Sequence, residues 1–106
     1  MIVKLEEFRE KLTELQEKGK LTDQTVEVVD DTHKYFIESY NEKNGKLIFE
    51  ITREFYTEFS NQQLFSVIEK SKANEVYLRN KDKNQDPKAL GDVYLSHWFL
   101  ELVASE

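Results

Sequence analysis

The amino-acid sequence predicts a single α+β domain, residues 1–106, in which helices pack on one face of a small antiparallel sheet. Three observations support this fold class. Apolar side chains recur with helical spacing over residues 2–18, strand-like runs occupy residues 25–55, and a capping motif at residues 60–63 begins a second helix. The expected order is helix, three antiparallel strands, helix, short strand and helix.

The first helix is predicted over residues 2–18. Its apolar residues recur three and four positions apart, which places them on one face: Ile2, Leu5, Phe8, Leu12 and Leu15. The opposite face mixes Glu and Lys at neighbouring turns, as is typical of a helix face in contact with water. Gly19 follows and suits the left-handed conformation that commonly ends a helix.

Three runs that follow are rich in β-branched and aromatic side chains, which favour strands. They cover residues 25–29, 34–40 and 46–55. Polar residues at positions 41–45 separate the last two runs, so we expect these two strands to form an antiparallel hairpin.

The register of this hairpin depends on its turn. A two-residue turn at Asn44 and Gly45 would put Glu38 on the apolar face, whereas a type I turn with Gly45 in a bulge pairs Glu42 with Lys46. We favour the bulged turn, because it gathers the apolar residues on the core side: Tyr35, Ile37, Leu47, Phe49 and Ile51.

In the favoured register Glu38 lies directly across from Glu50 on the exposed face, and Glu27 of the first strand extends the row if it points outward. Like charges at opposed positions cost stability, so a protein that keeps them can offer them to a positively charged partner. Aromatic residues mixed with fixed charge are also typical of binding surfaces. We therefore predict a partner-binding surface, called here the acidic strip, formed by Glu27, Asp30, Asp31, Phe36, Glu38, Tyr40, Ile48, Glu50 and Glu54.

The start of the second helix is the strongest local signal. Ser60 with Gln63 three residues later makes a capping box, and Phe59 with Leu64 makes a hydrophobic staple. We expect this helix to continue to about residue 73, followed by a short strand at residues 75–79.

A last helix is predicted to begin at Asp86 and Pro87, since Asp caps free amides and Pro fits the first helical position. Apolar residues between positions 90 and 103 surround more of this helix than one packed stripe requires. Two interpretations follow. The helix is central to the fold, or it carries an interface for self-association, anchored by Tyr94 and Trp98.

This order of elements resembles that of several small inhibitory proteins, including some phage anti-CRISPR proteins and bacterial toxin immunity proteins. The resemblance implies an inhibitory function, but it is architectural and transfers no residue.

Composition excludes several other classes. The chain has no Cys, so disulfides, thiolate catalysis and cysteine zinc sites are ruled out, and a reducing cytoplasm is the expected compartment. The acidic amino-terminal segment lacks the features of a secretory signal, and no apolar run is long enough to span a membrane. The chain has no cluster of Lys and Arg, which disfavours direct binding to a phosphate backbone, and isolated glycines exclude the familiar nucleotide-binding loops.

The best candidates for a catalytic or metal site are Asp30, Asp31 and His33, because carboxylates and an imidazole can hold a divalent ion or move protons. Acidic residues at a strand end are also common turn formers, and we favour that interpretation. His97 and Glu101, one helical turn apart, could form a base and its orienting carboxylate, but Ser96 would point away from them. We expect no enzyme activity, no cofactor and no metal.

The leading hypothesis is a non-enzymatic binding protein that inhibits a larger basic, nucleic-acid-handling protein by covering its positive surface. Residues 21–60 carry nine acidic and four basic side chains, which motivates this hypothesis. The alternative is a small structural or regulatory subunit that self-associates through the last helix.

Overall fold

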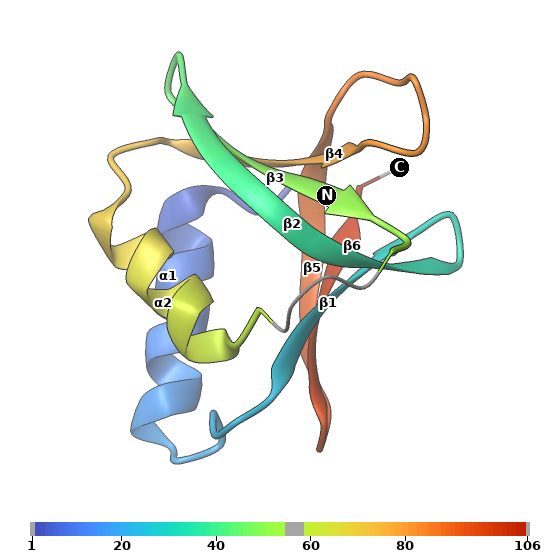
Figure 1. The fold of residues 1–106 in the computed structure, drawn as a ribbon. Helices are drawn as coiled ribbons and strands as arrows, with labels where there is room; N and C mark the ends of the chain where they lie inside the picture. The colour runs from blue at the N-terminus through green and yellow to red at the C-terminus, as the bar shows by residue number, and fades with distance from the viewer. Residues whose placement is uncertain (1, 55–58, 106) are drawn as a thin grey trace.

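The computed structural model describes residues 2–54 and 59–105. Six strands close into a barrel in chain order, and two helices lie side by side against one side of it (Figure 1). The elements are α1 (Leu5–Glu17), β1 (Thr25–Asp30), β2 (His33–Lys43), β3 (Lys46–Thr52), α2 (Asn61–Lys70), β4 (Glu75–Asn80), β5 (Lys88–Leu95) and β6 (Phe99–Ala104). No helix among the described residues is long and apolar enough to cross a membrane.

The predicted α+β fold is wrong, because the expected last helix is the hairpin formed by β5 and β6. Buried and less buried side chains alternate along β6, where Leu100 and Leu102 are fully buried and Glu101 between them is not. This period of two is the signature of a strand. The apolar residues that the sequence analysis assigns to many sides of one helix lie on the two faces of two strands. The resemblance to small inhibitory proteins rested on the wrong element order and is lost with it.

The barrel consists of two halves with the same order of elements, namely α1-β1-β2-β3 and α2-β4-β5-β6. Strands within each half are antiparallel, and two parallel seams join the halves. In each seam the strands pair from their first residues, Lys46 with Glu75 and Thr25 with Phe99. The halves are therefore related by an approximate two-fold axis.

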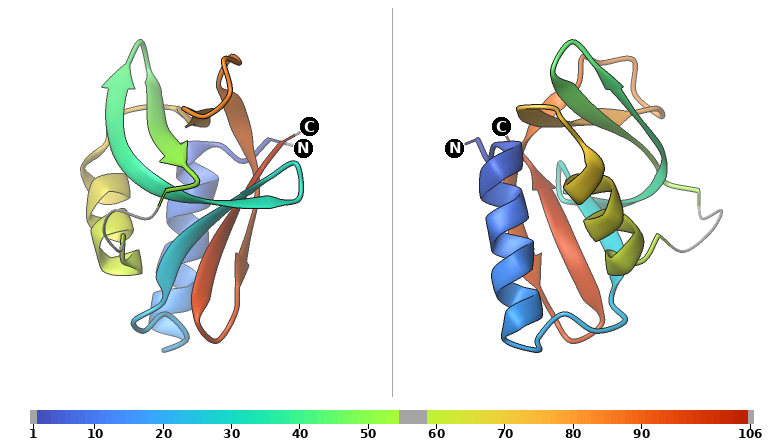
Figure 2. Two further views of the ribbon diagram at one scale, coloured as in Figure 1. Left: turned by 45° about the vertical axis from the view of Figure 1, so that its right-hand side comes forward. Right: turned by 90° about the vertical axis from the view of Figure 1, so that its left-hand side faces the viewer.

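The segments that precede the helices follow the same symmetry. Lys4, the N-cap of α1, bridges the first residue of β4, and Ser60, the N-cap of α2, bridges the first residue of β1. The first amide of each helix donates to the residue before the bridged strand, at 3.1 Å in both halves. Two further views of the ribbon show that both helices lie on the same side of the barrel (Figure 2). The sequence shows no repeat, so the symmetry lies in the backbone.

The helices largely confirm the predictions made for them. Leu5, Phe8 and Leu12 of α1 are buried, and Gly19 has a φ of 68° just beyond its end. The helix begins at Leu5, because the chain before it joins the sheet, and the predicted core residue Ile2 is exposed.

The capping box of α2 is present. Ser60 Oγ accepts from the Gln63 amide at 3.2 Å, and Gln63 Oε1 accepts from the Ser60 amide at 2.9 Å. The helix ends at Lys70, three residues earlier than expected, because Ser71 adopts an extended conformation.

The predicted bulged turn between β2 and β3 is wrong. Asn44 and Gly45 have φ values of 53° and 76°, and Lys43 pairs with Lys46, so the turn has two residues. We had rejected this register because it placed Glu38 on the apolar face. A β-bulge between Ile37 and Ser39 removes that conflict by absorbing Glu38. The predicted core residues are nevertheless all buried: Tyr35, Ile37, Leu47, Phe49 and Ile51. The prediction for residue 55 lies outside the described residues.

Candidate protein-binding surface

The carboxylates of the acidic strip do not face one another across the hairpin. Ser39 lies opposite Glu50, because the two-residue turn sets that register, and the bulge beyond it leaves Glu38 without an opposing residue. Lys81 Nζ lies 3.1 Å from Glu38 Oε2 and 4.0 Å from Glu50 Oε2. Arg79 Nη1 also lies 3.8 Å from Glu50 Oε1. Basic side chains from β4 and the loop after it therefore compensate both carboxylates within the fold.

The remaining acidic residues of β1 are also paired. Glu27 is 3% exposed, and Lys34 Nζ lies 3.2 Å from its Oε1. Asp30 is buried, and its carboxylate accepts from Lys88 Nζ at 2.7 Å and from Asn80 Nδ2 at 3.3 Å. Both carboxylates are therefore buried and paired within the fold rather than standing free at its surface.

Asp31 forms an exposed ion pair with Lys83, with 2.7 Å between Oδ2 and Nζ. The hydrogen bond from Lys83 lowers the pKa of Asp31 below its ordinary value. Reciprocally, the bond to Asp31 raises the pKa of Lys83, and the bond to Asp30 raises the pKa of Lys88.

The other members of the acidic strip lie on different surfaces. Tyr40 is 51% exposed, but it pairs with Phe49 and so lies on the core side of the hairpin, beside α2. Phe36 and Ile48 are half-buried. Glu54 is exposed just after β3, and its amide donates to Thr52 Oγ1 at 3.3 Å. The nine predicted residues do not form one continuous patch.

The geometry expected for the catalytic candidates is not present. Asp30 forms an ion pair with Lys88 and Asp31 forms one with Lys83. His33 Nδ1 lies 2.9 Å from the Asp31 carbonyl oxygen. Within residues 2–54 and 59–105 no three His, Asp or Glu side chains are grouped to hold a metal ion. The helical spacing proposed for His97 and Glu101 does not apply, since His97 lies in a turn and Glu101 in a strand.

The turn between β5 and β6 carries the most exposed large hydrophobic side chain among the described residues. Trp98 is 71% exposed, and its ring meets the His97 ring edge to face, with centroids 4.6 Å apart. The turn is closed by hydrogen bonds between Ser96 and Phe99: the Ser96 amide donates to the Phe99 carbonyl at 2.8 Å, and the Phe99 amide donates to Ser96 Oγ at 3.0 Å. Tyr94, one residue before the end of β5, is 54% exposed.

The two-fold relationship provides an internal comparison for Trp98. Gly45 precedes the first residue of β3, as Trp98 precedes the first residue of β6. The Gly45 carbonyl accepts from the Glu75 amide and the Trp98 carbonyl from the Thr25 amide, both at 3.2 Å. The first half therefore makes this backbone hydrogen bond at a residue that has no side chain, so the bond itself does not require an indole.

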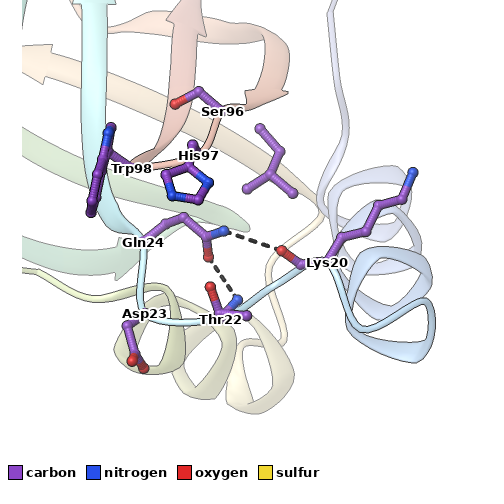
Figure 3. A pocket seen from close by; sticks show the side chains of 8 residues that line it. Lys20, Thr22, Asp23, Gln24, Ser96, His97 and Trp98 are labelled. Atoms are coloured by element: carbon purple, nitrogen blue, oxygen red, sulfur yellow. Dashed lines mark hydrogen bonds between the residues drawn. The ribbon is translucent and has the colours of Figure 1, made fainter.

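A hollow of about 540 Å³ lies between this turn and the connection from α1 to β1 (Figure 3). Its floor is held by Gln24, which donates to the Lys20 carbonyl at 3.1 Å and accepts from the Thr22 amide at 2.7 Å and from Asn61 Nδ2 at 2.9 Å. In Figure 3 the His97 ring points toward the Gln24 side chain and Trp98 stands beside it, whereas Asp23 points away. The hollow is lined by Lys20, Thr22, Asp23, Gln24, Leu95, Ser96, His97 and Trp98.

Sequence reasoning found part of this surface. Tyr94 and Trp98 were singled out, but as neighbours on a helix, whereas they lie in a strand and in a turn. The contribution of residues 20–24 was missed, because it depends on a contact between distant segments. The polar Glu101 between Leu100 and Leu102 was the available signal for the strand.

Comparisons of the chain with protein-family models, with curated proteins and with solved structures found no match. A proposal for its function therefore has to rest on the geometry described above.

Proposed function

We propose that the protein is a non-enzymatic protein-binding module that docks through the turn between β5 and β6. The observation that carries this proposal is the exposure of Trp98 at a position where the other half of the fold has Gly45. An indole in contact with water gives up the free energy of its burial, which a partner can recover. Trp is also among the residues most enriched at the energetic centres of interfaces.

The surroundings of Trp98 favour this function. Hydrogen bonds within the turn and from Thr25 fix its backbone, and the His97 ring packs on the indole. A side chain that is already ordered loses little entropy on binding. The adjacent hollow, with Leu95 among its lining residues, can receive a side chain of the partner.

The class of partner is proposed from charge. The net charge of −6 favours a basic protein, and the inhibition of a nucleic-acid-handling protein is one form of this proposal. Direct contact with nucleic acid or a membrane, and a bound cofactor, are not part of it. We place the protein in a cytoplasm, as the absence of Cys allows.

Self-association is the second candidate, because Tyr94 and Trp98 are both exposed on the same hairpin. A homodimer formed there would bury both rings. Sedimentation at several protein concentrations distinguishes the two candidates, since a dimer that Trp98→Ser dissociates supports self-association, whereas a concentration-independent monomer contradicts it.

The main test is affinity capture from a nuclease-treated lysate of the source cell. The wild-type protein is compared with Trp98→Ser and with a matched control, Tyr40→Ser, which removes another exposed aromatic side chain. We expect a partner that wild type and Tyr40→Ser retain and Trp98→Ser loses. Equal recovery by all three proteins would contradict docking through this turn.

A further inference from the structure

We infer that the β5–β6 hairpin recognises an arginine-bearing segment of a partner protein through Tyr94 and Glu101. This inference rests on the proposed function and specifies the chemistry of the partner. It follows from how the structure distributes its charge pairs, from the exposed aromatic rings of this hairpin and from the register of β5, β6 and β1.

Three neighbouring strands place Tyr94, Glu101 and Glu27 in one row. Tyr94 pairs with Glu101, and Glu101 pairs with Glu27. Residues that pair across strands lie on the same face of the sheet. The predicted opposition of Glu38 and Glu50 is absent, and a different pair of carboxylates, Glu27 and Glu101, lies opposed between β1 and β6.

The two carboxylates of this row differ in their partners. Lys34 lies 3.2 Å from Glu27, whereas no Lys or Arg nitrogen of the described residues lies within 4.0 Å of Glu101. Glu27, Asp30, Asp31, Glu38 and Glu50 each have such a partner. The fold therefore compensates these five charges of the predicted acidic strip, whereas Glu101 has no such partner among the described residues.

Asp92 adds a second carboxylate beside Tyr94. Asp92 accepts a hydrogen bond from the Val93 amide at 2.8 Å. A hydrogen bond from the Tyr94 side chain lowers the pKa of Asp92 the most, and the bond from the Val93 amide lowers it further. Asp92 therefore stays ionised at neutral pH. The described basic groups near this hairpin include Lys34, which is engaged by Glu27 and lies 5.8 Å from the Phe99 ring centroid, and Lys20 at the hollow. Lys11 also lies close enough for its charge to lower the pKa of Asp92, and Lys88, the first residue of β5, is paired with Asp30.

An exposed aromatic ring directly opposite a carboxylate suits arginine better than lysine. A guanidinium can bind both carboxylate oxygens and stack on an aromatic face, whereas an ammonium is a compact and strongly hydrated charge. A second copy of this chain fits less well, because it would bring the same uncompensated carboxylates to the interface.

The test uses the full-length protein and the blocked peptide acetyl-(Gly-Arg)₃-amide, followed by backbone amide and indole NMR shifts. The peptide with Arg replaced by citrulline is the neutral control. We expect saturable shifts at Tyr94, Glu101 and neighbouring residues with the arginine peptide alone. They should weaken at about 0.15 M salt, where the Debye length is about 8 Å.

Matched variants separate local recognition from general charge. Glu101→Gln and Glu50→Gln each remove one negative charge, but Glu50 is already paired with Arg79 and Lys81. We expect Glu101→Gln to weaken peptide binding about two- to fivefold and Glu50→Gln to change it less. Equal effects of the two variants, or no saturable shift, would overturn the inference. If Trp98→Ser still abolishes capture of a partner in that case, the proposed docking turn stands and only its arginine chemistry is wrong.

Discussion

Trp98 and Gly45 occupy equivalent positions in the two halves of the barrel. Each precedes the first residue of the third strand of its half, and each carbonyl accepts a hydrogen bond from the first residue of the strand across a parallel seam. The largest side chain in the chain thus stands where the symmetry-related position has none. The two turns differ in length, with two residues between β2 and β3 and three between β5 and β6. Both make this hydrogen bond across a seam, and only the second presents a large exposed side chain at this position.

Removing the indole should therefore leave folding unaffected. We expect Trp98→Ser to change the free energy of unfolding by less than about 0.5 kcal/mol, as is usual for exposed positions. Leu102→Ala, at a fully buried position of the same hairpin, should cost about 2–5 kcal/mol. Urea denaturation of both variants checks this. A large loss for Trp98→Ser would mean that the indole supports the turn rather than a partner.

Reversing the charges of Glu38 and Glu50 should lower stability. If the two carboxylates opposed each other, Glu38→Lys with Glu50→Lys would relieve repulsion and raise the melting temperature. In the structure both face basic groups, Lys81 and Arg79, so the new lysines would meet like charges. Because these groups are partly exposed, we expect a decrease of only a few degrees. A higher melting temperature would contradict the observed register.

The ion pair between Lys88 and the buried Asp30 can be tested by removing its two members one at a time. Lys88→Met would leave the Asp30 carboxylate buried without its cation, and we expect a cost of about 3 kcal/mol. Adding Asp30→Asn removes the uncompensated charge, so the double variant should be more stable than Lys88→Met alone. Denaturant titration of the single and double variants measures this difference. A double variant that is the less stable of the two would show that the ion pair is not what holds Asp30.

The exposed pair of Asp31 with Lys83 should make stability depend on pH at the acidic end. The pKa of Asp31 is lowered in the folded protein, so its contribution is complete above the ordinary value of 3.8 and is lost as the pH falls through the lower folded value. The difference in melting temperature between wild type and Asp31→Asn should therefore shrink below pH 3.8. Asp23→Asn removes an acidic residue that has no ion pair among the described residues, and it should show no such trend. A difference that is unchanged on acidification would contradict the pairing.

Sequence reasoning succeeded where local chemistry determines structure. The capping box of Ser60 and Gln63 and the face formed by Leu5, Phe8 and Leu12 were recognised because their partners lie within a few residues. The core residues of β2 and β3 were also found, because burial alternates over residues 35–37 and 47–51.

Sequence reasoning failed where the structure depends on contacts between distant segments. Asp86 and Pro87 suit a helix start, but Lys88 and Ala89 pair with β4 and the segment from Leu90 onward pairs with β6. This tertiary pairing overrides the local preference. The bulge at Glu38 resolved a conflict that looked decisive along the chain. Likewise, no local pattern indicates that Lys81, in a loop some forty residues later, compensates Glu38. Because such contacts between distant segments pair the predicted carboxylates within the fold, the candidate site is the turn between β5 and β6 and not the acidic strip.

Gly91 should be the glycine least tolerant of substitution by alanine. It lies at the irregularity in the pairing of β5 with β6, and an added Cβ would lie 2.9 Å from Ser105 Cα and 3.0 Å from Ser105 N. Because these are backbone atoms, the end of the chain must shift, at a cost of about 1–3 kcal/mol. Gly19→Ala is the control, since its site is open and only its φ of 68° opposes alanine, at about 1 kcal/mol. We expect Gly91→Ala to be the less stable variant in urea denaturation and to weaken the protection of the Ser105 amide from hydrogen exchange. An unchanged Ser105 amide would show that the added methyl group is accommodated without moving the chain.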